Sequence, residues 1–464
     1  MKGRVTLLGA GPGNSELLTL IGKRRLKEAD VVLYDRLIDP SLLAFTAKNA
    51  ELVDVGKMPL HHKVKQSKIN EMLVNYANDG KKVVRLKAGD PYVFGRGGEE
   101  AQVLNNQGVN FEIIPGITSA IAGLAAAGIP ITHRDYASSF HIITGHHKKD
   151  GQQLDWENIA HQEGTLVFLM GMAQLSNICQ ELISHGKDLQ TPVAVIQWAT
   201  QWRQKKVIGN LTNINDLVVK HQIGAPALIV VGNVVQLSDE LSVRKPLDGI
   251  HLLVPFSARQ RLFNLLTDLG ATADFYSRQE KVPVATDFSA INKYSSILID
   301  DVASFRQFIQ LLIRNGKDLR VLAGKQIIAG NQSVAKHLKA MGLLVDKIMP
   351  VDISQTNLVE LGGEKPQYNI GRFLKLYKEE HSLLTLPFEL AEFSGVVFPS
   401  TASLNDFLTS LDEEQKSHLQ SLKAFTMGKL ICQAAQRCGF SEVINCQPNL
   451  QATVEKIKEE FARD

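Results

Sequence analysis

The chain has 464 residues, of which 44% are hydrophobic and 21% charged, and its formal net charge is +3. This length exceeds a single hydrophobic core and predicts two or three domains, while the small net charge argues against a protein built to wrap nucleic acid. The cysteines, Cys179, Cys432, Cys438 and Cys446, form no CxxC pair and no metal-binding spacing with histidine. We therefore expect reduced thiols, no metal, no signal peptide and no membrane span, as in a cytoplasmic protein.

Strand-like apolar runs alternate with helical patterns, which predicts an α/β fold. In the first half these runs are VTLLGA, DVVLYD, KVVRL, FEIIPG, FHIITG, TLVFLM, TPVAVIQ and ALIVVG. The polar stretch 236–249 ends in proline and glycine, as linkers do. We therefore predict a first domain over 1–238, a linker over 239–248 and a second domain over 249–464.

The second domain repeats the alternation, with strands predicted in GIHLLVP, SSILID, QIIAG, LLVDKIMP, GVVFPS and AFTMG. The segments 281–288 and 382–390 look like extended crossings between two lobes. They predict lobe 1 over about 249–281 and 388–464, and lobe 2 over about 283–386.

The chain opens on a glycine loop, RVTLLGAGPGNSELLTL, in residues 4–20. A strand, a glycine turn and a helix starting near Asn14 or Ser15 are how a dinucleotide-binding unit begins. The GxGxxG fingerprint fails here, because its third glycine is replaced by Asn14 and Pro12 removes an N–H donor from the loop. The loop favours neither a nicotinamide nor a flavin, and a purely structural turn stays open.

A second glycine-rich stretch, VVRLKAGDPYVFGRGGEEAQVL, covers residues 83–104. Small residues at 88 and 89 let a ligand approach the backbone, and Asp90 lies at the carboxyl end of a strand, where α/β folds bind ligands. So much glycine and charge in one loop favours a binding site over a plain connection.

With the opening loop, this stretch resembles the tetrapyrrole methylases, and specifically the uroporphyrinogen-III C-methyltransferases. Further matches follow in order and spacing up to about residue 238, among them ADVVLYDRLI, IIPGITSAIAGLAAAGIPITHRDYASSFHIITGH, GTLVFLMGM and TPVAVIQWATQWRQK. The resemblance implies two α/β subdomains, S-adenosylmethionine (SAM) as methyl donor in the cleft between them, a homodimer, and double methylation of uroporphyrinogen III to precorrin-2.

The resemblance also implies site residues. The positions that correspond to the family's SAM contacts are Pro12, Ala88, Gly89, Asp90, Val93, Thr118, Ser119, Met170 and Ala199. Asp35 matches the family's proposed acid–base aspartate, and Lys57 matches its proposed proton donor or substrate partner. The substrate carries eight carboxylates and needs cationic partners, for which we select Arg36, Arg96 and Arg134; Arg85 and Lys87 are further candidates.

Residues from about 249 onward resemble the uroporphyrinogen-III synthases, which cyclise hydroxymethylbilane without a cofactor. Ser400, Thr401 and Lys429, at strand-to-helix turns, are the candidate carboxylate contacts, although such turns are also ordinary helix caps. Two departures stand out. Asp300 and Asp301 lie where the family often has a Thr-Ser pair, and the predicted returning crossing, SLLTLPFEL, lacks the family's tyrosine.

Four hypotheses remain. They are a bifunctional methyltransferase–synthase of sirohaem or cobalamin synthesis, a methyltransferase with an inactive C-terminal scaffold, a nicotinamide-dependent dehydrogenase, and a methylase of a later corrin intermediate. The first explains both modules and their order, because the synthase product is the methylase substrate.

Overall fold

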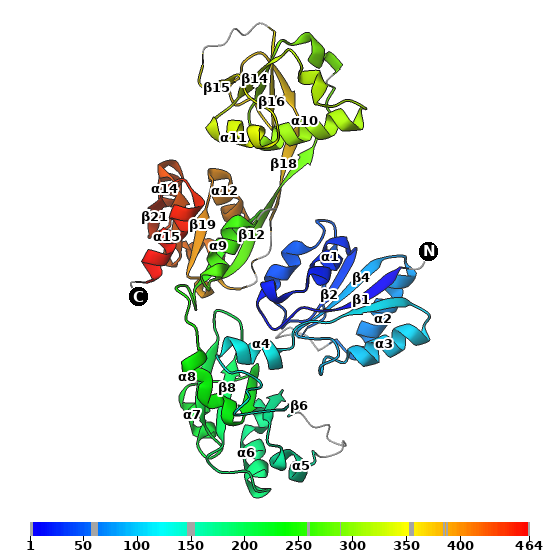
Figure 1. The fold of residues 1–464 in the computed structure, drawn as a ribbon, viewed down its shortest axis with the longest axis vertical. Coiled ribbons are helices and arrows are strands. Elements are labelled where there is room, and N and C mark those ends of the chain that lie inside the picture. Colours follow the sequence, from blue (N-terminus) through cyan, green and yellow to red (C-terminus); the bar gives the residue numbers. More distant parts are fainter. Residues whose placement is uncertain are drawn as a thin grey trace. The chain divides into compact units, whose positions relative to one another are not determined.

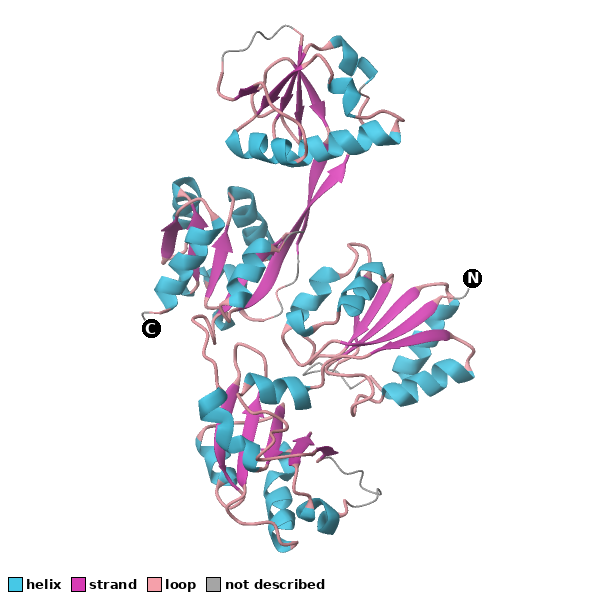
Figure 2. Cartoon of the chain, in the orientation of Figure 1, coloured by secondary structure: helices cyan, strands magenta, loops and turns pink. Residues whose placement is uncertain are grey.

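The computed structural model describes residues 3–56, 64–145, 154–257, 260–287, 289–351, 357–383, 386 and 388–462. It forms two compact units, one of residues 1–254, 260–276 and 384–464, the other of residues 255–259 and 277–383. Every sheet combines with helices (Figure 1, Figure 2), so the chain is an α/β protein, as predicted. No helix in the described ranges is long and apolar enough to span a membrane.

The first sheet is parallel, with the strand order β3-β2-β4-β1-β5. Its strands are β1 (Arg4–Gly9), β2 (Val31–Tyr34), β3 (Glu51–Asp54), β4 (Lys82–Lys87) and β5 (Asn110–Ile114). The helices α1 (Leu20–Glu28), α2 (Gln66–Asn78) and α3 (Gly97–Asn106) cover its two faces (Figure 2). The central strands β1, β2 and β4 are buried along most of their length, as expected for a parallel sheet covered on both faces, whereas the edge strand β3 is mostly exposed.

The first helical turn differs from the prediction. Asn14 caps a short 3-10 helix, Ser15–Leu17, and α1 starts only at Leu20 with Thr19 as its N-cap. Two cap residues five positions apart divide the predicted helix, because each one satisfies N–H groups at a new helix start.

The second sheet mixes parallel and antiparallel pairs in the order β6-β7-β10-β8-β9. Helix α4 (Ser119–Ala126) leads into it. The strands are β6 (Phe140–Thr144), β7 (Thr165–Leu169), β8 (Pro192–Gln197), β9 (Lys205–Asn210) and β10 (Ala227–Val231), and the helices are α5 (Trp156–His161), α6 (Leu175–Ser184), α7 (Ile214–Lys220) and α8 (Ser238–Leu241).

The third sheet has the order β18-β12-β11-β19-β20-β21. Its strands are β11 (His251–Phe256), β12 (Thr272–Pro283), β18 (Tyr377–Leu383), β19 (Gly395–Phe398), β20 (Lys423–Met427) and β21 (Val443–Cys446). The helices that accompany it are α9 (Arg261–Asp268), α12 (Thr401–Ser410), α13 (Glu413–Ser417), α14 (Lys429–Arg437) and α15 (Leu450–Phe461).

The fourth sheet belongs to the second unit and is parallel, in the order β15-β14-β13-β16-β17. It contains β13 (Ser296–Ile299), β14 (Gln326–Ala329), β15 (Lys347–Ile348), β16 (Leu358–Gly362) and β17 (Arg372–Lys375), with α10 (Val302–Arg314) and α11 (Gln332–Ala340). Its core gathers apolar side chains of β13, α10 and α11, including Ile297, Phe305 and Leu338.

Apart from the short segment 255–259, the chain leaves the first unit within β12 and returns after β18. These strands pair antiparallel from Ser277↔Leu383 to Pro283↔Tyr377. Both crossings are therefore strands of one ladder, which start earlier than the predicted 281–288 and 382–390. The returning strand starts on a tyrosine, Tyr377, so the expectation that this crossing lacks one is wrong.

Candidate functional site

The two glycine-rich loops of the first sheet are hydrogen-bonded to each other. The amide of Gly11 donates to the carbonyl of Gly89 (3.2 Å), and the amide of Gly89 donates to the carbonyl of Gly11 (2.7 Å). Both glycines have positive φ, +82° and +68°, a conformation that favours glycine. A Cβ on Gly9 would lie 2.4 Å from the backbone nitrogen of Gly116. The glycines therefore shape and pack the loops.

A cavity of about 230 Å³ lies between the first and second sheets' loops. All the residues predicted to contact SAM line it: Pro12, Ala88, Gly89, Asp90, Val93, Thr118, Ser119, Met170 and Ala199. The fold thus brings together residues that are up to 187 positions apart. Gly9 and Gly11 are not among its lining residues, so of the opening loop it is Pro12 that faces the cavity.

The carboxylate of Asp90 fixes two loops of the cavity wall by hydrogen bonds. Its Oδ1 accepts the amide of Tyr92 (2.8 Å), and its Oδ2 accepts the amide of Gly116 (3.0 Å). Thr118 caps α4 by accepting the amide of Ala120 (3.4 Å), so the N–H groups of the first helical turn start at the cavity wall. Such groups suit an anionic group of a ligand.

Sequence reasoning missed further lining residues, among them Phe94 and Trp198. Phe94, Met170 and Trp198 combine bulky side chains with φ values of 53°, 56° and 50°, and all of them line the cavity. Left-handed backbone at bulky residues is uncommon and gathers at functional sites. Met170 was predicted from the family motif. Phe94 and Trp198 were not predicted, because no local sequence pattern indicates a positive φ at a phenylalanine or a tryptophan.

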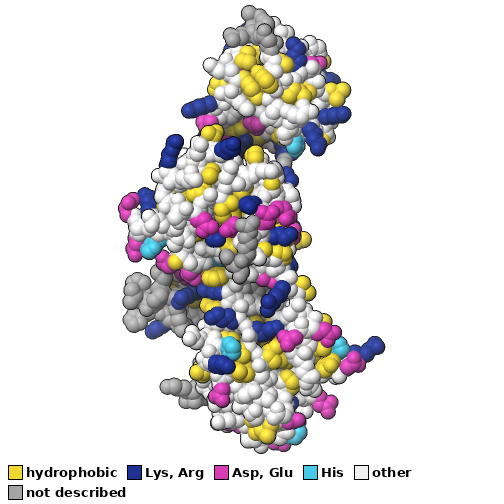
Figure 3. Space-filling view, turned by 90° about the vertical axis from the view of Figure 1, so that its left-hand side faces the viewer, with side chains coloured by type: hydrophobic (Ala, Val, Ile, Leu, Met, Phe, Trp, Pro, Cys, Tyr) yellow, Lys and Arg dark blue, Asp and Glu magenta, His cyan; other side chains and the backbone are white. Residues whose placement is uncertain are grey.

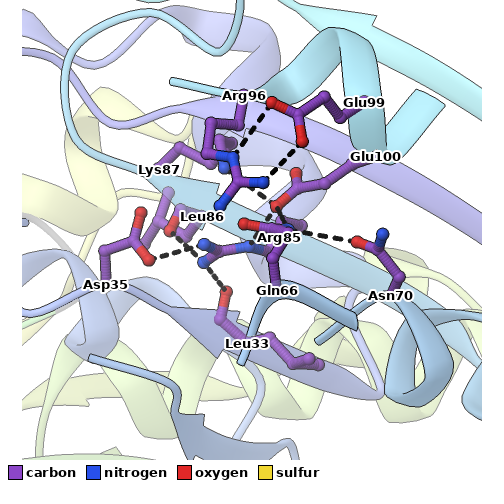
Figure 4. A network of polar contacts seen from close by, with 10 residues as sticks. All are labelled: Leu33, Asp35, Gln66, Asn70, Arg85, Leu86, Lys87, Arg96, Glu99 and Glu100. Atoms are coloured by element: carbon purple, nitrogen blue, oxygen red, sulfur yellow. Dashed lines mark hydrogen bonds and ion pairs between the residues drawn. The ribbon is translucent and has the colours of Figure 1, made fainter. Parts of the chain in front are cut away.

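Asp35 follows β2 and is held from the neighbouring strand. Its Oδ1 accepts Nη2 of Arg85 at 2.5 Å, and its side chain remains 32% exposed (Figure 4). Arg85 and Lys87, which were candidates for binding substrate carboxylates, are buried instead and both contact Glu100. Lys57, the other predicted catalytic residue, lies outside the described residues.

The predicted substrate-binding arginines lie at different places. Arg36 lines a second cavity, which shares Leu37, Trp198 and Gln201 with the first. Arg96 is exposed and forms a two-point ion pair with Glu99 (2.5 and 3.0 Å). Arg134 is exposed in the turn between His133 and Ala137. On the face drawn in Figure 3, basic and acidic side chains are interspersed.

The predicted contacts of the C-terminal half lie at one edge of the third sheet. Ser400 follows β19 and caps α12 in a capping box with Ser403, and Thr401 starts that helix. Lys429 is exposed and starts α14, directly after β20. Because β19 and β20 are parallel neighbours, their carboxyl ends bring Ser400, Thr401 and Lys429 to the same edge.

The two acids of the second unit do not form an exposed negative pair. Asp300 is buried and Asp301 caps α10. The hydroxyl of Tyr377 donates to Oδ2 of Asp301 (2.8 Å) and accepts Nζ of Lys281 (2.7 Å). Although burial acts to raise it, the pKa of Asp301 is lowered by the Ser304 amide and by Lys281. These contacts place a tyrosine and a lysine beside the acids.

Comparison with known proteins identifies the family. Residues 4–215 match the Tetrapyrrole (Corrin/Porphyrin) Methylases. A uroporphyrinogen-III C-methyltransferase of Bacillus subtilis (strain 168) is 44% identical over 356 residues, which cover 75% of this chain and 74% of that protein. The porphyrin biosynthesis protein HemD of Ruminiclostridium josui is 33% identical over 500 aligned residues, which cover 98% of both.

A solved structure, uroporphyrin-III C-methyl transferase from Thermus thermophilus complexed with S-adenyl homocysteine, is 41% identical. It covers 51% of this chain and 100% of its own, with a TM-score of 0.45. The sequence identities to the Bacillus and Ruminiclostridium proteins, over three quarters and nearly all of the chain, decide the assignment. The chain belongs to the tetrapyrrole methylases, in the branch of the uroporphyrinogen-III C-methyltransferases.

Proposed function

We propose that the protein transfers methyl groups from SAM to two carbons of uroporphyrinogen III and so forms precorrin-2. The observation that carries the proposal is the convergence of nine predicted SAM contacts on one cavity. The names of the related methyltransferases supply the acceptor and the reaction.

The chemistry is an in-line displacement. A pyrrole carbon attacks the sulfonium methyl group, the carbon–sulfur bond breaks, S-adenosylhomocysteine leaves, and the methylated ring then loses a proton. The enzyme contributes mainly by aligning the two reactants. We assign Pro12, Ala88, Gly89 and Val93 to the wall along SAM, and the first turn of α4, at Thr118 and Ser119, to its carboxylate.

Asp35 is the group we assign to the acceptor side. A pyrrole gains positive charge as it attacks, and a carboxylate beside it stabilises that charge and then takes the proton. Arg36, Arg96, Arg134 and Lys57 are assigned to the carboxylates of the substrate, since guanidinium and ammonium groups pair with carboxylates.

The test uses the purified full chain with SAM and uroporphyrinogen III. We expect precorrin-2, and the absence of any methylated product would refute the proposal. Asp35→Asn should lower turnover about a hundredfold to ten-thousandfold while the Kd for SAM changes by less than about threefold. A large loss of SAM affinity would remove Asp35 from the acceptor side.

We further propose that the C-terminal half cyclises hydroxymethylbilane to uroporphyrinogen III. Its support is a relative named for porphyrin biosynthesis that matches nearly the whole chain. When SAM is left out of the assay, so that no methylation takes place, the full chain should convert hydroxymethylbilane to the type III isomer. Formation of the spontaneous type I isomer alone would favour a scaffold role for this half.

A homodimer is the assembly we propose from the family resemblance. Sedimentation velocity over a range of protein concentrations tests it, and a single species of monomer mass throughout would refute it.

A further inference from the structure

A balanced cluster of charges lies beneath the carboxyl end of β4. Arg85 and Lys87 are on the same strand, two positions apart, and therefore point to the same face of the sheet. Asp35 follows β2, and Glu100 lies in the first turn of α3. Two cations and two anions thus meet in one place, and three of them are almost completely buried (Figure 4).

The guanidinium of Arg85 is fixed from several directions. Its Nη2 donates to Oδ1 of Asp35 (2.5 Å), and its Nε donates to Oε1 of Glu100 (3.3 Å). Its Nη1 donates to the carbonyls of Leu33 (3.4 Å) and Leu86 (3.3 Å). The side chain of Arg85 is only 3% exposed. Because its other N–H groups are bonded inside the sheet, the planar guanidinium can offer Asp35 its Nη2 in one fixed orientation.

Glu100 holds Arg85 at Nε, while Asp35 contacts its Nη2. The side chain of Glu100 is 0% exposed, and its Oε1 also accepts Nζ of Lys87 (3.0 Å) and Nε2 of Gln66 (2.9 Å). Burial, followed by the charge of Arg85, lowers the pKa of Lys87. A buried charge is tolerated only when it is paired, so Glu100 is what permits Arg85 and Lys87 to lie inside.

Asp35 is the most exposed member of the cluster. Its side chain is 32% exposed, and among the described residues the side-chain hydrogen bond it accepts ends on Oδ1. Leu37, two residues further on, lines both cavities. None of the four charged residues, Asp35 included, lines either cavity, but Asp35 is directly followed in the chain by Arg36 and Leu37, which do.

We propose that Arg85 is a positioning residue for methyl transfer, which holds Asp35 by one carboxylate oxygen and leaves the other for the acceptor ring, with Glu100 and Lys87 as its buried support. The inference rests on the proposed role of Asp35. It assigns Arg85 and Lys87 a place behind the catalytic group rather than on the substrate.

A double-mutant cycle tests this role in the full chain. Arg85→Gln should lower kcat for precorrin-2 formation about tenfold to a hundredfold, since small misplacements of catalytic groups have such effects. The Kd for SAM, measured by calorimetry, should change by less than about twofold. In the Asp35→Asn background, Arg85→Gln should lower kcat by less than about twofold further, because coupled residues are not additive.

An equal loss of kcat in both backgrounds would overturn the positioning role. A wild-type chain that makes no methylated product would refute the proposed function itself, and the positioning role with it. An active enzyme in which Asp35→Asn keeps full turnover would remove Asp35, and therefore Arg85, from the mechanism while leaving the methyltransferase activity standing.

Two further variants separate positioning from folding. If Arg85→Gln melts early, the charge-balanced Arg85→Gln/Glu100→Gln variant is carried through the same cycle, with the same expected non-additivity. Arg25→Gln is the matched control, because it removes an arginine–carboxylate pair with Glu112 (2.6 and 3.2 Å) from the same sheet. It should leave kcat within about twofold of the wild type.

Discussion

A buried carboxyl pair in the second unit should make the stability of that unit depend on pH. Asp300 follows β13 and is 3% exposed, and Glu360 in β16 is 0% exposed. The oxygens of Glu360 accept the amides of Tyr368 (2.8 Å) and Ile370 (3.1 Å). Burial, and then the neighbouring Glu360, raise the pKa of Asp300 from its ordinary 3.8 to about 8. Asp300 is therefore protonated at neutral pH.

The direction and size of the effect follow from this shift. Between pH 4 and pH 8 the folded unit keeps a proton that the unfolded chain releases, so raising the pH stabilises the unfolded chain relative to the folded unit. The contribution of Asp300 is fully present below pH 4, declines as the pH rises through about 8, and is constant above. One pKa unit corresponds to about 1.4 kcal/mol, so the free energy of unfolding falls by about 4 kcal/mol between pH 4 and pH 7.

Asp300→Asn removes this proton linkage while keeping the shape. The variant should match the wild type near pH 4 and exceed it by up to about 4 kcal/mol at pH 7. Hydrogen exchange of peptides from β13 and β16 measures the opening free energy of this unit alone, with wild type and variant compared at each pH. A constant difference between the two proteins from pH 4.5 to pH 8 would refute the assignment.

Asp318→Asn provides the matched control in the same unit. Asp318 is exposed and bonded to Arg320 (2.9 Å), and this hydrogen bond lowers its pKa. The pH dependence of the free energy of unfolding is therefore opposite to that of Asp300. The stabilising contribution of Asp318 is present at neutral pH and is lost as the pH falls through its folded pKa. An exposed pair contributes little, so exchange in β13 and β16 should remain nearly unchanged.

Gly9→Ala should lower both the melting temperature and the affinity for SAM, because its Cβ would lie 2.4 Å from another loop's backbone. Gly98→Ala, where no atom lies within 4 Å of the added Cβ, should stabilise α3 by about 0.5–1 kcal/mol. A larger drop in melting temperature in this variant than in Gly9→Ala would refute the packing argument. Ala199→Leu should raise the Kd for SAM at least about tenfold in calorimetry, since Ala199 lines the cavity, and unchanged binding would place SAM elsewhere. Tyr377→Phe should reduce the share of type III isomer formed from hydroxymethylbilane, and an unchanged isomer ratio would show that this hydroxyl serves folding only.

The wall of the cavity could be predicted from the sequence to an unusual degree. Its predicted residues were carried over from the family's motifs, and they lie in loops that follow the carboxyl ends of strands, where α/β folds bind ligands. Pro12 and Asp90 belong to this class. Phe94 and Trp198 do not, because their left-handed backbone is imposed by the surrounding fold and leaves no local signal.

Charged residues were harder to assign. Arg85 and Lys87 are indistinguishable in the sequence from cations that bind a substrate's carboxylates, yet both are buried against Glu100. Likewise, Asp300 resembles an exposed acid and is instead buried beside Glu360. Whether a charged side chain is exposed or buried depends on the residue that it contacts. Glu100 lies in α3 and Glu360 in β16, and neither belongs to the same element as the residues that it contacts.

The sequence by itself determined the α/β alternation, the family and the loops that meet at the cavity, because periodicity, glycine positions and motif order are properties of the chain alone. Only the tertiary structure decided which charges line a cavity, as Arg36 does, and which are buried in ion pairs, as Arg85 and Lys87 are. It also showed that the strand returning from the second unit starts at Tyr377 and pairs with β12. Burial and strand pairing join residues far apart in the chain, so no local window of sequence contains them.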